Sequence, residues 1–425
     1  MKRIAALALV AAVSLTGCRG AETPTTSGEV KTDVGVTKEA CPAAIDKNKG
    51  CIYLGIISDL TEGPFKALAV PITDAQKAFW ARVNQAGGIG NYEVDATTYI
   101  RDNKYNPQTH KEVYDQIKTK VLALGQTLGS PTPGAILGDM KSNNVVAAPA
   151  AWSSAYAFED VILESGANYC IESMNAMDYA VDKYQIKSVL AVHYAGDYGD
   201  DAAAGAKIAA EKLGVTFSHV KTDAGADKQA AAIAEILGKK PDLVIVSTGP
   251  TELATIVGGA AQRGFTGRFI GTSPTWNPAL NASAAAPALA ALYEQSAPWN
   301  SWSANTPGHE ALRKALSSVT PNEGYTAGWV WSYPLKSALE KAVANKDLTR
   351  AGLLAAVKSL ESVDYEGMLP SDAGNFKAAA AGQIKVTAFY KPDKAAITGV
   401  TQVKDLSVGK TAAAYTLDRP CYEKL

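Results

Sequence analysis

The sequence contains few of the residues from which metal sites and enzyme active sites are commonly built. Its 425 residues include four histidines and five cysteines, and they contain no C-x-x-C pair and no G-x-S-x-G motif. The histidines are scattered, and no two of them stand at the interval of a zinc site. The missing motifs exclude a C-x-x-C dithiol redox centre and a nucleophile elbow. We therefore expect no metal, no other cofactor and no catalytic residue, and so a protein that is not an enzyme.

The chain also lacks an excess of charge, and beyond its first residues it lacks any long apolar run. Its formal net charge is −1 and it has no basic stretch, so it has no electrostatic basis for binding a nucleic acid. Hydrophobic residues make up 47% and charged residues 20%, which is typical of a globular body in water. A body of about 400 residues exceeds what one core usually holds, so two domains are expected.

The start of the chain is different, because a lone cysteine follows an apolar stretch there. Two basic residues precede that stretch, and SLTGCRG (14–20) ends it with small residues before Cys18. This order is typical of a secretory signal, and the ending resembles the bacterial lipobox, in which the cysteine is acylated. We expect residues 1–17 to be a signal peptide and residues 18–50 a flexible, lipid-anchored tether. The protein would be exported and held at the outer face of the cytoplasmic membrane by its lipid alone. The alternative is an ordinary signal peptide with an incidental cysteine.

Four cysteines remain if Cys18 is lipidated, which is an even number in an oxidising compartment. They permit three pairings, and the sequence does not choose among them. The closeness of Cys41 and Cys51 favours a small local loop, and the remaining pair would be Cys170 with Cys421. The alternative is that one or both pairs stay reduced and buried.

From Cys51 onward the chain alternates short β-rich runs with amphipathic stretches of helical length. This alternation predicts an α/β fold of parallel sheets with helices on their faces. The first predicted strand, at 52–60, is followed by a helix at 72–88 in which apolar residues recur at helical spacing. The next predicted elements are strands at 92–100, 121–128 and 145–152 and helices at 106–120 and 133–144.

A second series of the same kind begins after Cys170. Its predicted strands lie at 188–194, 215–220, 242–249 and 268–273, and its predicted helices at 174–184, 200–214, 226–239 and 251–264. Beyond about Ser296 the pattern changes to two helices, at 306–319 and 324–342, and then to β-rich pieces. We expect this tail to complete both halves. One lobe would comprise residues 51–172 and about 297–345, and the other residues 173–296 and about 346–425.

Several loops that follow predicted strands carry a resemblance to a known family. The segments are ISDLTEGPF (57–65), VVAAPAAWSS (145–154), VLAVHYAGDYG (189–199), PDLVIVSTGPTE (241–252) and GFTGRFIGTSPTW (264–276). In this order they resemble the type I periplasmic solute-binding proteins of the branched-chain amino acid ABC transporter class, from Ile52 to about Glu366. The resemblance implies two Rossmann-like lobes with a three-segment hinge and one small ligand bound between them. It also implies a monomer that delivers its ligand to the permease subunits of an ABC importer, and a closed form that the ligand stabilises.

The family's pocket, carried over to matching positions, predicts the ligand-binding residues. They are Thr61, Phe65, Gly129, Ser130, Ala150, Ala151 and Trp152 in the first lobe and Tyr198, Thr248, Gly249, Ser273 and Trp276 in the second. Main-chain N–H groups in such turns can hold a carboxylate or another acceptor. The alternative for the threonines and glycines is ordinary turn chemistry, and for the two tryptophans it is packing under the loops as core.

The sequence departs from the family at TSPTWNP (272–278), where amino-acid binders of this class carry an acid for the ligand ammonium. A buried ammonium without a partner is costly, although Asp59 or Glu62 would be a substitute from the other lobe. With Trp152 and Trp276 near the cleft, we expect an aromatic or apolar carboxylate or amide as the ligand. A binder of branched-chain or other amino acids and a ligand-sensing receptor remain alternatives. A secreted hydrolase, which would have no histidine close to its nucleophile in sequence, is a more remote one.

Overall fold

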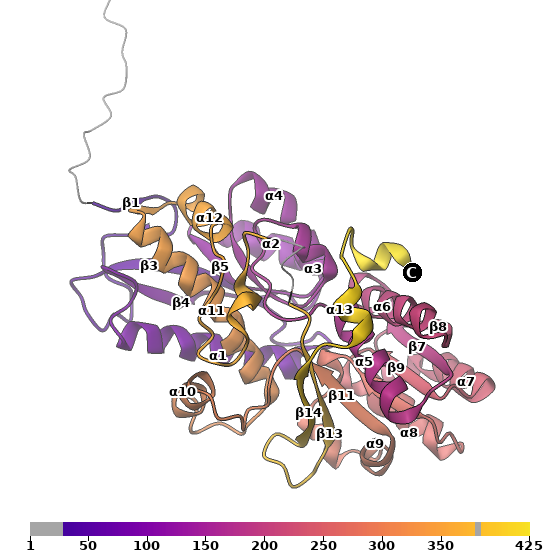
Figure 1. The fold of residues 1–425 in the computed structure, drawn as a ribbon. Helices are drawn as coiled ribbons and strands as arrows, with labels where there is room; N and C mark the ends of the chain where they lie inside the picture. Colours follow the sequence, from indigo (N-terminus) through magenta and orange to yellow (C-terminus); the bar gives the residue numbers. More distant parts are fainter. Residues whose placement is uncertain (1–28, 379–383) are drawn as a thin grey trace, which may run out of the picture.

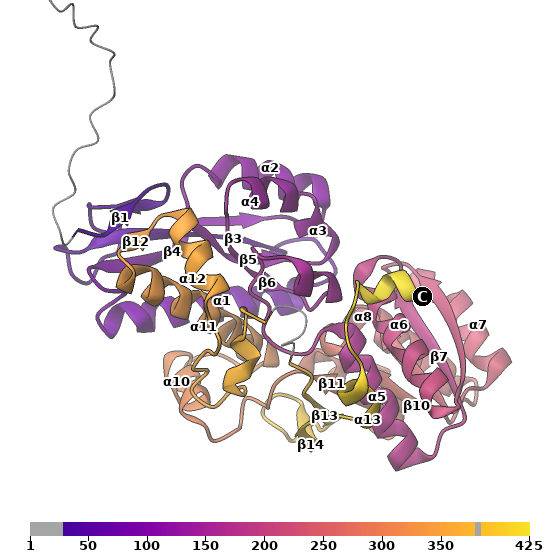
Figure 2. The same cartoon turned by 45° about the horizontal axis from the view of Figure 1, so that its top comes forward.

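The computed structural model describes residues 29–378 and 384–425. Its helices and strands gather into two lobes, one drawn mainly in indigo, purple and orange and the other mainly in magenta and pink (Figure 1). Each lobe is a sheet with helices on its faces, and the turned view shows the same separation (Figure 2). This is the two-lobed α/β architecture that the alternation of strands and helices predicts.

The first lobe is built on a five-stranded sheet around β3 (Gly50–Ser58). Ile52, Leu54 and Ile56 belong to the core on one face of this sheet and Ile57 to the core on the other, so β3 is buried from both sides. Its neighbours are β2 (Val36–Thr37), which is antiparallel to it, and the parallel strands β4 (Tyr92–Asp102), β5 (Ala123–Leu128) and β6 (Ala147–Ala150). The helices are α1 (Lys66–Gln85), α2 (Pro107–Ile117), α3 (Pro131–Gly134), α4 (Leu137–Ser142), α10 (Pro307–Ala315), α11 (Glu323–Ala344) and α12 (Arg350–Lys358).

The second lobe is built on a seven-stranded sheet in the order β14-β13-β11-β10-β9-β7-β8. Five of its strands are parallel: β7 (Ser188–Tyr194), β8 (Thr216–Thr222), β9 (Leu243–Ser247), β10 (Arg268–Gly271) and β11 (Tyr293–Ala297). The hairpin of β13 (Thr387–Pro392) and β14 (Val400–Ser407) extends the sheet antiparallel to β11. The helices are α5 (Tyr169–Tyr184), α6 (Asp197–Leu213), α7 (Ala230–Lys239), α8 (Pro250–Gln262) and α9 (Ala286–Leu292).

Side-chain caps and glycines mark where several helices begin and end. The Asn106 side chain accepts a hydrogen bond from the N–H of Thr109, and Pro107 holds the first position of α2, as the sequence predicts. Gly214 ends α6 with a φ of +67°, a conformation that glycine adopts without strain. Helix α1 begins at Lys66, earlier than the predicted residue 72, because Pro71 lies inside the helix rather than before it.

The chain passes between the two sheets three times, as a three-segment hinge requires. The passages follow β6, follow β11 and precede β13. Before the third passage α12 packs against α11, and apolar residues from Leu348 to Ala373 belong to the core of the first lobe. The expected boundary near residue 346 is therefore wrong, because apolar residues of the segment that follows α11 cover that helix before the chain returns to the second lobe.

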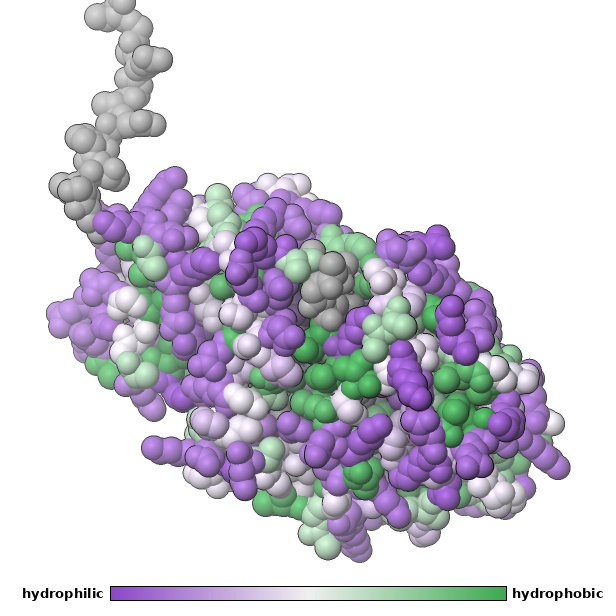
Figure 3. Space-filling model, viewed as in Figure 1, coloured by the Kyte–Doolittle hydropathy of each residue, from purple (hydrophilic) through white to green (hydrophobic). Residues whose placement is uncertain are grey.

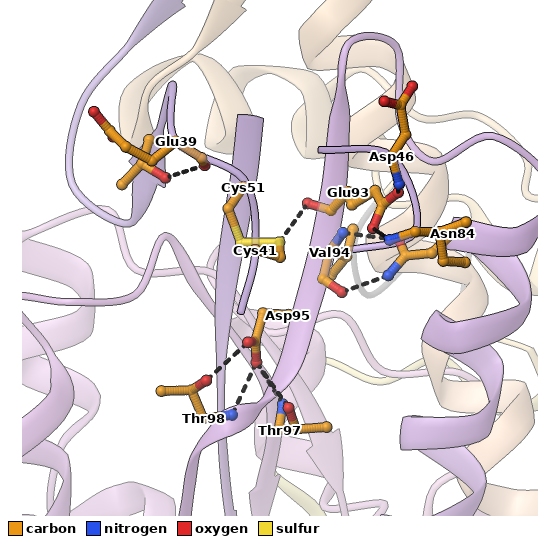
Figure 4. Close-up of a disulfide and its surroundings, with 12 residues drawn as sticks. Glu39, Cys41, Asp46, Cys51, Asn84, Glu93, Val94, Asp95, Thr97 and Thr98 are labelled. Atoms are coloured by element: carbon orange, nitrogen blue, oxygen red, sulfur yellow. Dashed lines mark hydrogen bonds between the residues drawn. A yellow bond between two sulfur atoms is a disulfide. The ribbon is translucent and has the colours of Figure 1, made fainter. Parts of the chain in front are cut away.

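The expected flexible tether is also wrong for residues 29–50, which pack on the first lobe. Val36 and Thr37 pair with β3, while β1 (Lys31–Thr32) pairs with β12 (Asp347–Leu348). Cys41 is disulfide-bonded to Cys51, and the Glu93 carboxylate accepts hydrogen bonds from the N–H groups of Ile45 and Asp46 at 2.9 and 2.7 Å (Figure 4). The predicted signal peptide and the predicted lipidation site Cys18 lie outside the described residues.

The C-terminal segment is fastened to the second lobe by the other disulfide. Cys170, in α5, is bonded to Cys421, so both pairings that the sequence favours are present. Next to this bond the Asp201 carboxylate accepts hydrogen bonds from the N–H groups of Ser154 and Tyr422, at 2.6 and 3.1 Å. The short helix α13 (Lys410–Ala414) packs against α5. Within residues 29–378 and 384–425, no helix combines the length and the apolar character needed to cross a membrane.

Candidate functional site

A cavity lies between the two lobes, at the ends of β5 and β6 on one side and of β10 and β11 on the other. It holds about 870 Å³ of space between its lining atoms, counting the part that is open to solvent. The face drawn in Figure 3 is mostly polar, and apolar residues gather near its middle, where the lobes adjoin. The lining residues are Phe65, Leu68, Ala69, Ile72, Tyr105, Leu128, Gly129, Ala150, Ala151, Trp152, Tyr169, Tyr198, Ser273, Pro274, Trp276, Pro278, Gln295, Ala297, Trp299, Asn322, Glu323, Gly324, Ala327, Trp331, Tyr390 and Val400.

Three indoles from distant parts of the sequence form one wall. Trp152 lies between Trp299 and Trp331, with ring centroids 5.0 and 4.2 Å away. Its own N–H donates to the carbonyl of Ser165 at 2.8 Å, which fixes the ring. This stack joins the end of β6, the hinge and α11 into one apolar surface, and such surfaces bind flat or aliphatic groups.

Phe65 connects the two lobes across the mouth of the cavity. Its ring centroid lies 4.8 Å from that of Tyr105 in the first lobe and 6.1 and 6.4 Å from those of Tyr198 and Tyr194 in the second. The Phe65 N–H donates to Asp59, which sets the turn before α1. The aromatic contacts across the mouth place the two lobes in a closed arrangement.

The second-lobe loop after β10 is held from behind by a buried carboxyl group. Glu172 lies 2.9 Å from the N–H of Ser273, 2.9 Å from Ser273 Oγ and 2.6 Å from Ser296 Oγ. Burial raises the pKa of Glu172 to about 8. Ser296 Oγ is also 3.0 Å from the carbonyl oxygen of Gly271. Since a hydroxyl carries one proton, protonated Glu172 can donate to Ser296 while Ser296 donates to Gly271.

The other hydroxyl and amide groups of this wall are engaged with the protein itself. The Gln295 amide donates to the carbonyl oxygens of Thr272 and Ser273 at 3.0 and 2.9 Å. The Tyr198 hydroxyl lies 2.9 Å from Thr272 Oγ1, and the Tyr390 hydroxyl donates to the carbonyl of Trp299 at 2.6 Å. These hydrogen bonds shape the wall and leave its apolar parts facing inward.

Glu323, at the start of α11, is the one charged side chain among the described lining residues. Its carboxyl group accepts hydrogen bonds from the N–H of Trp302 at 3.2 Å and from Thr326 Oγ1 at 3.1 Å. The side chains of Thr398 and Trp299 also hydrogen-bond to it, and burial raises its pKa. Glu323 therefore ties α11, the hinge and the β13–β14 loop together.

Eight of the predicted ligand-binding residues line this cavity: Phe65, Gly129, Ala150, Ala151, Trp152, Tyr198, Ser273 and Trp276. They meet there because the carboxyl ends of parallel strands in both sheets face the same gap. The structure thus brings together predicted positions that are more than 200 residues apart in the sequence.

Four predicted residues do not line the cavity. Thr61 is exposed and donates to the Asp102 carboxylate. Ser130 is buried beside the lining residue Gly129, and its hydroxyl has no partner within the described chain. Thr248 and Gly249 lie behind the wall, where the Thr248 carbonyl faces the Tyr198 hydroxyl at 3.3 Å. Their turns support the lining residues rather than belonging to the lining.

The two acids considered as partners for a ligand ammonium are turned away from the cavity. The Asp59 carboxylate accepts hydrogen bonds from the N–H groups of Gly63 and Phe65, and burial raises its pKa. Glu62 is exposed and pairs with Lys104 at 3.0 Å. Neither of them lines the cavity.

The sequence reasoning missed several lining residues, above all Tyr169, Trp299, Glu323, Trp331 and Tyr390. Four of them lie in the hinge or in segments that follow it, away from the strand-end loops on which the prediction concentrated. One signal was available, because the run GYTAGWVWSY at the start of α11 has no charged residue on any side. A helix of that kind is buried all round and presents residues to two environments.

No group of three or more His, Cys, Asp or Glu side chains in the described part of the chain is placed to hold a metal ion. The cavity itself offers aromatic surface, peptide groups and one carboxyl group, a set suited to reversible binding of a small, largely apolar molecule.

Comparison with known proteins gives one family. A family model described as periplasmic binding protein matches residues 52–394. A search of curated proteins gives no match. Among solved structures, a fatty acid ABC transporter substrate-binding protein from Thermomonospora curvata is 30% identical, with a TM-score of 0.83. The similarity covers 91% of this chain and 97% of that one.

More distant structures share the fold. A branched-chain amino acid ABC transporter protein from Thermus thermophilus, solved with bound valine, is 14% identical with a TM-score of 0.72. The similarity covers 86% of this chain and 98% of that one. A leucine binding protein from Thermotoga maritima is 16% identical with a TM-score of 0.70, and the coverage is 84% and 99%. At these identities the likeness extends to the fold alone.

Proposed function

This chain belongs to the periplasmic binding protein family, and on that premise we propose that it captures a largely apolar carboxylate or amide for an ABC importer. Its relatives are non-enzymatic substrate-binding components of ABC transporters. The observation that carries the proposal is the aromatic cavity between the lobes, to which both lobes and the hinge contribute. A ligand that touches both lobes stabilises the closed form, and the closed form is what a permease recognises.

The ligand class follows from the walls. The indole stack and the aromatic residues at the mouth supply apolar area, while the Tyr198 hydroxyl and the Gln295 amide of the second-lobe wall are already bonded within the protein. The fatty acid transport protein from Thermomonospora curvata supports a ligand with a long apolar body. A free amino acid is the second candidate, because Glu323 lines the cavity and is the one group there to meet an ammonium.

A thermal-shift screen of the exported chain tests the ligand class. The panel contains straight-chain and aromatic acids, their amides, and leucine, valine and isoleucine. We expect the apolar acids or amides to raise the melting temperature and to lower the radius of gyration in X-ray scattering. Stabilisation by leucine alone would overturn the apolar ligand, and an unchanged scattering curve at saturation would overturn closure by the ligand.

The proposed protein is tethered to the membrane by acylated Cys18, which keeps it close to its permease at a raised effective concentration. The Cys18→Ser variant should be released from the membrane fraction with its fold intact. Cys170→Ser is the control, because it breaks the disulfide to Cys421 in the body of the protein and leaves the anchor in place. Retention of Cys18→Ser in the membrane fraction would contradict the anchor.

A further inference from the structure

Two indole N–H groups at the cavity have no acceptor in the described chain. Trp276 follows β10 in the second lobe and is 4% exposed, and Trp331 lies on α11 in the first lobe and is 1% exposed. Both residues line the cavity, and neither Nε1 atom has a hydrogen-bond partner. A buried N–H without an acceptor is costly, so native proteins rarely leave one unless something else satisfies it.

Other tryptophans at or near the cavity are satisfied. The Trp152 N–H donates to Ser165, and that of Trp329, on the opposite face of α11, donates to the Tyr333 hydroxyl at 3.0 Å. The Trp299 side chain hydrogen-bonds to Glu323. Trp80 also lacks a partner, but it lies in the core of the first lobe and not at the cavity. The two unpartnered donors therefore belong to residues of the cavity wall, where a ligand is the remaining source of an acceptor.

The charges around the cavity restrict what that acceptor can be. None of the described lining residues is Lys, Arg or His. Glu323 lines the cavity and Glu172 lies directly behind Ser273. An ionised carboxylate would enter without a cation to offset the cost of its desolvation. Burial raises the pKa of both glutamates, which is consistent with a site poor in positive charge.

Building on the proposed function, we infer that the ligand's polar head is bound uncharged, as a carbonyl-type acceptor held by the indole N–H groups of Trp276 and Trp331. A primary amide, an ester and a protonated carboxylic acid share this chemistry. A cationic head would suit the aromatic walls, but it would leave both N–H groups without an acceptor. Its obvious counter-charge, Glu323, already accepts hydrogen bonds from Trp302 and Thr326.

The test uses two matched ligand series on the intact exported chain, so that it does not depend on any variant. One series is 4-phenylbutanamide, 4-phenylbutanoate, 3-phenylpropyl-trimethylammonium and butylbenzene. The other is octanamide, octanoate and octyltrimethylammonium. At pH 7.5 the amide should bind at least about tenfold more tightly than the carboxylate of the same skeleton. At pH 5.0 the gap should shrink to about threefold, because a large share of the acid is then neutral.

Variants identify the donors. Trp276→Phe and Trp331→Phe should each weaken binding of the amide by about fivefold, since each removes one N–H. Butylbenzene, which has no acceptor, should change by less than about twofold and so controls for the altered ring. Trp80→Phe is the matched control, because it removes an unpartnered N–H away from the cavity, and it should leave every affinity unchanged.

The outcomes separate the inference from the proposed function. If the carboxylate or the ammonium binds as tightly as the amide at pH 7.5, the uncharged head is wrong while the apolar binding function stands. Equal losses for the amide and butylbenzene in the Phe variants would also overturn the role of the N–H groups. If no compound of either series binds, the proposed function itself is wrong.

Discussion

The two walls of the cavity are held in place by different forces. On the first-lobe side, Ile72 and Phe65 of the α1 segment and Trp331 of α11 contribute mainly by packing. On the second-lobe side, the loop after β10 is fixed by hydrogen bonds to Glu172 and Gln295. Packing is not directional and tolerates side chains of similar volume, whereas a buried hydrogen-bond network permits one arrangement. We therefore expect the first wall to adapt to a ligand and the second to present a fixed surface.

The largest effect should come from removing the carboxyl group behind the second wall. Glu172→Ala leaves the N–H and hydroxyl of Ser273 and the hydroxyl of Ser296 without their partner, in a place that water does not reach. We expect the free energy of unfolding to fall by roughly 3–5 kcal/mol, as measured by urea denaturation.

Two variants sharpen this comparison of the walls. Glu172→Gln keeps the shape of the side chain, so the free energy of unfolding should fall by less than half as much as in Glu172→Ala. Ile72→Val, on the packed wall, should cost about 0.5–1.5 kcal/mol. If Glu172→Ala and Ile72→Val cost the same, the two walls do not differ in the way described.

The second wall should also respond to pH. Burial raises the pKa of Glu172 to about 8, from 4.5 for an ordinary glutamate. Between these values the folded protein keeps a proton that the unfolded chain has released. The protonated Glu172 carboxyl group therefore makes its full contribution to stability below pH 4.5. That contribution falls by about 1.4 kcal/mol per pH unit as the pH rises towards 8.

The free energies of unfolding of the parent chain and of Glu172→Gln are measured by urea denaturation at pH 5.5 and 7.5. The difference between the two proteins isolates the pH dependence that Glu172 contributes. Buried His110 and His193 act in the opposite direction, because burial lowers their pKa to about 3 and about 4. Their contribution is common to both proteins and cancels in the difference. A difference that does not change between the two pH values would show that Glu172 is ionised in the folded protein.

A smaller effect is expected from the indole that the second wall presents to the ligand. Trp276 is buried against Tyr293, with ring centroids 5.9 Å apart, and lines the cavity. Trp276→Ala should weaken the binding of an apolar ligand by roughly 1–3 kcal/mol, measured by calorimetry. Ile72→Val should change the affinity much less, because the packed wall adapts. An unchanged affinity in correctly folded Trp276→Ala would assign this indole to the core rather than to the site.

The elements of the fold were predictable where their signal is local. Apolar residues at helical spacing predict α1, Asn106-Pro107 predicts the start of α2, and β-rich runs predict β7 and β9. The short pairings β1–β12 and β2–β3 were missed, because two-residue strands in a polar segment leave no periodic pattern. The assignment of α12 to the second lobe failed for a related reason, since periodicity reveals that a helix has an apolar face but not which partner covers it.

The candidate site also contains residues that the sequence could place and residues that it could not. Turns that follow strands could be placed at the cavity, because the carboxyl ends of parallel strands meet at one edge. Thr248 and Thr61 follow strands too, but only the folded chain turns the first behind Tyr198 and the second towards Asp102. Residues of the hinge and of α11 could not be placed, because their contribution depends on how far the two lobes close.

The sequence by itself determined the order of strands and helices and the two-lobed organisation, because these depend on local spacing and on chain length. It favoured two cysteine pairs without choosing among the three pairings, and the structure shows which bonds form. Tertiary structure alone decided which face of α11 meets the cavity, so that Trp331 lines it while Trp329 lies in the first-lobe core. It also decided that Glu172 supports Ser273, although 101 residues separate them. The physical reason is that burial and hydrogen bonding arise between surfaces brought together by folding, and no local pattern encodes which surfaces will meet.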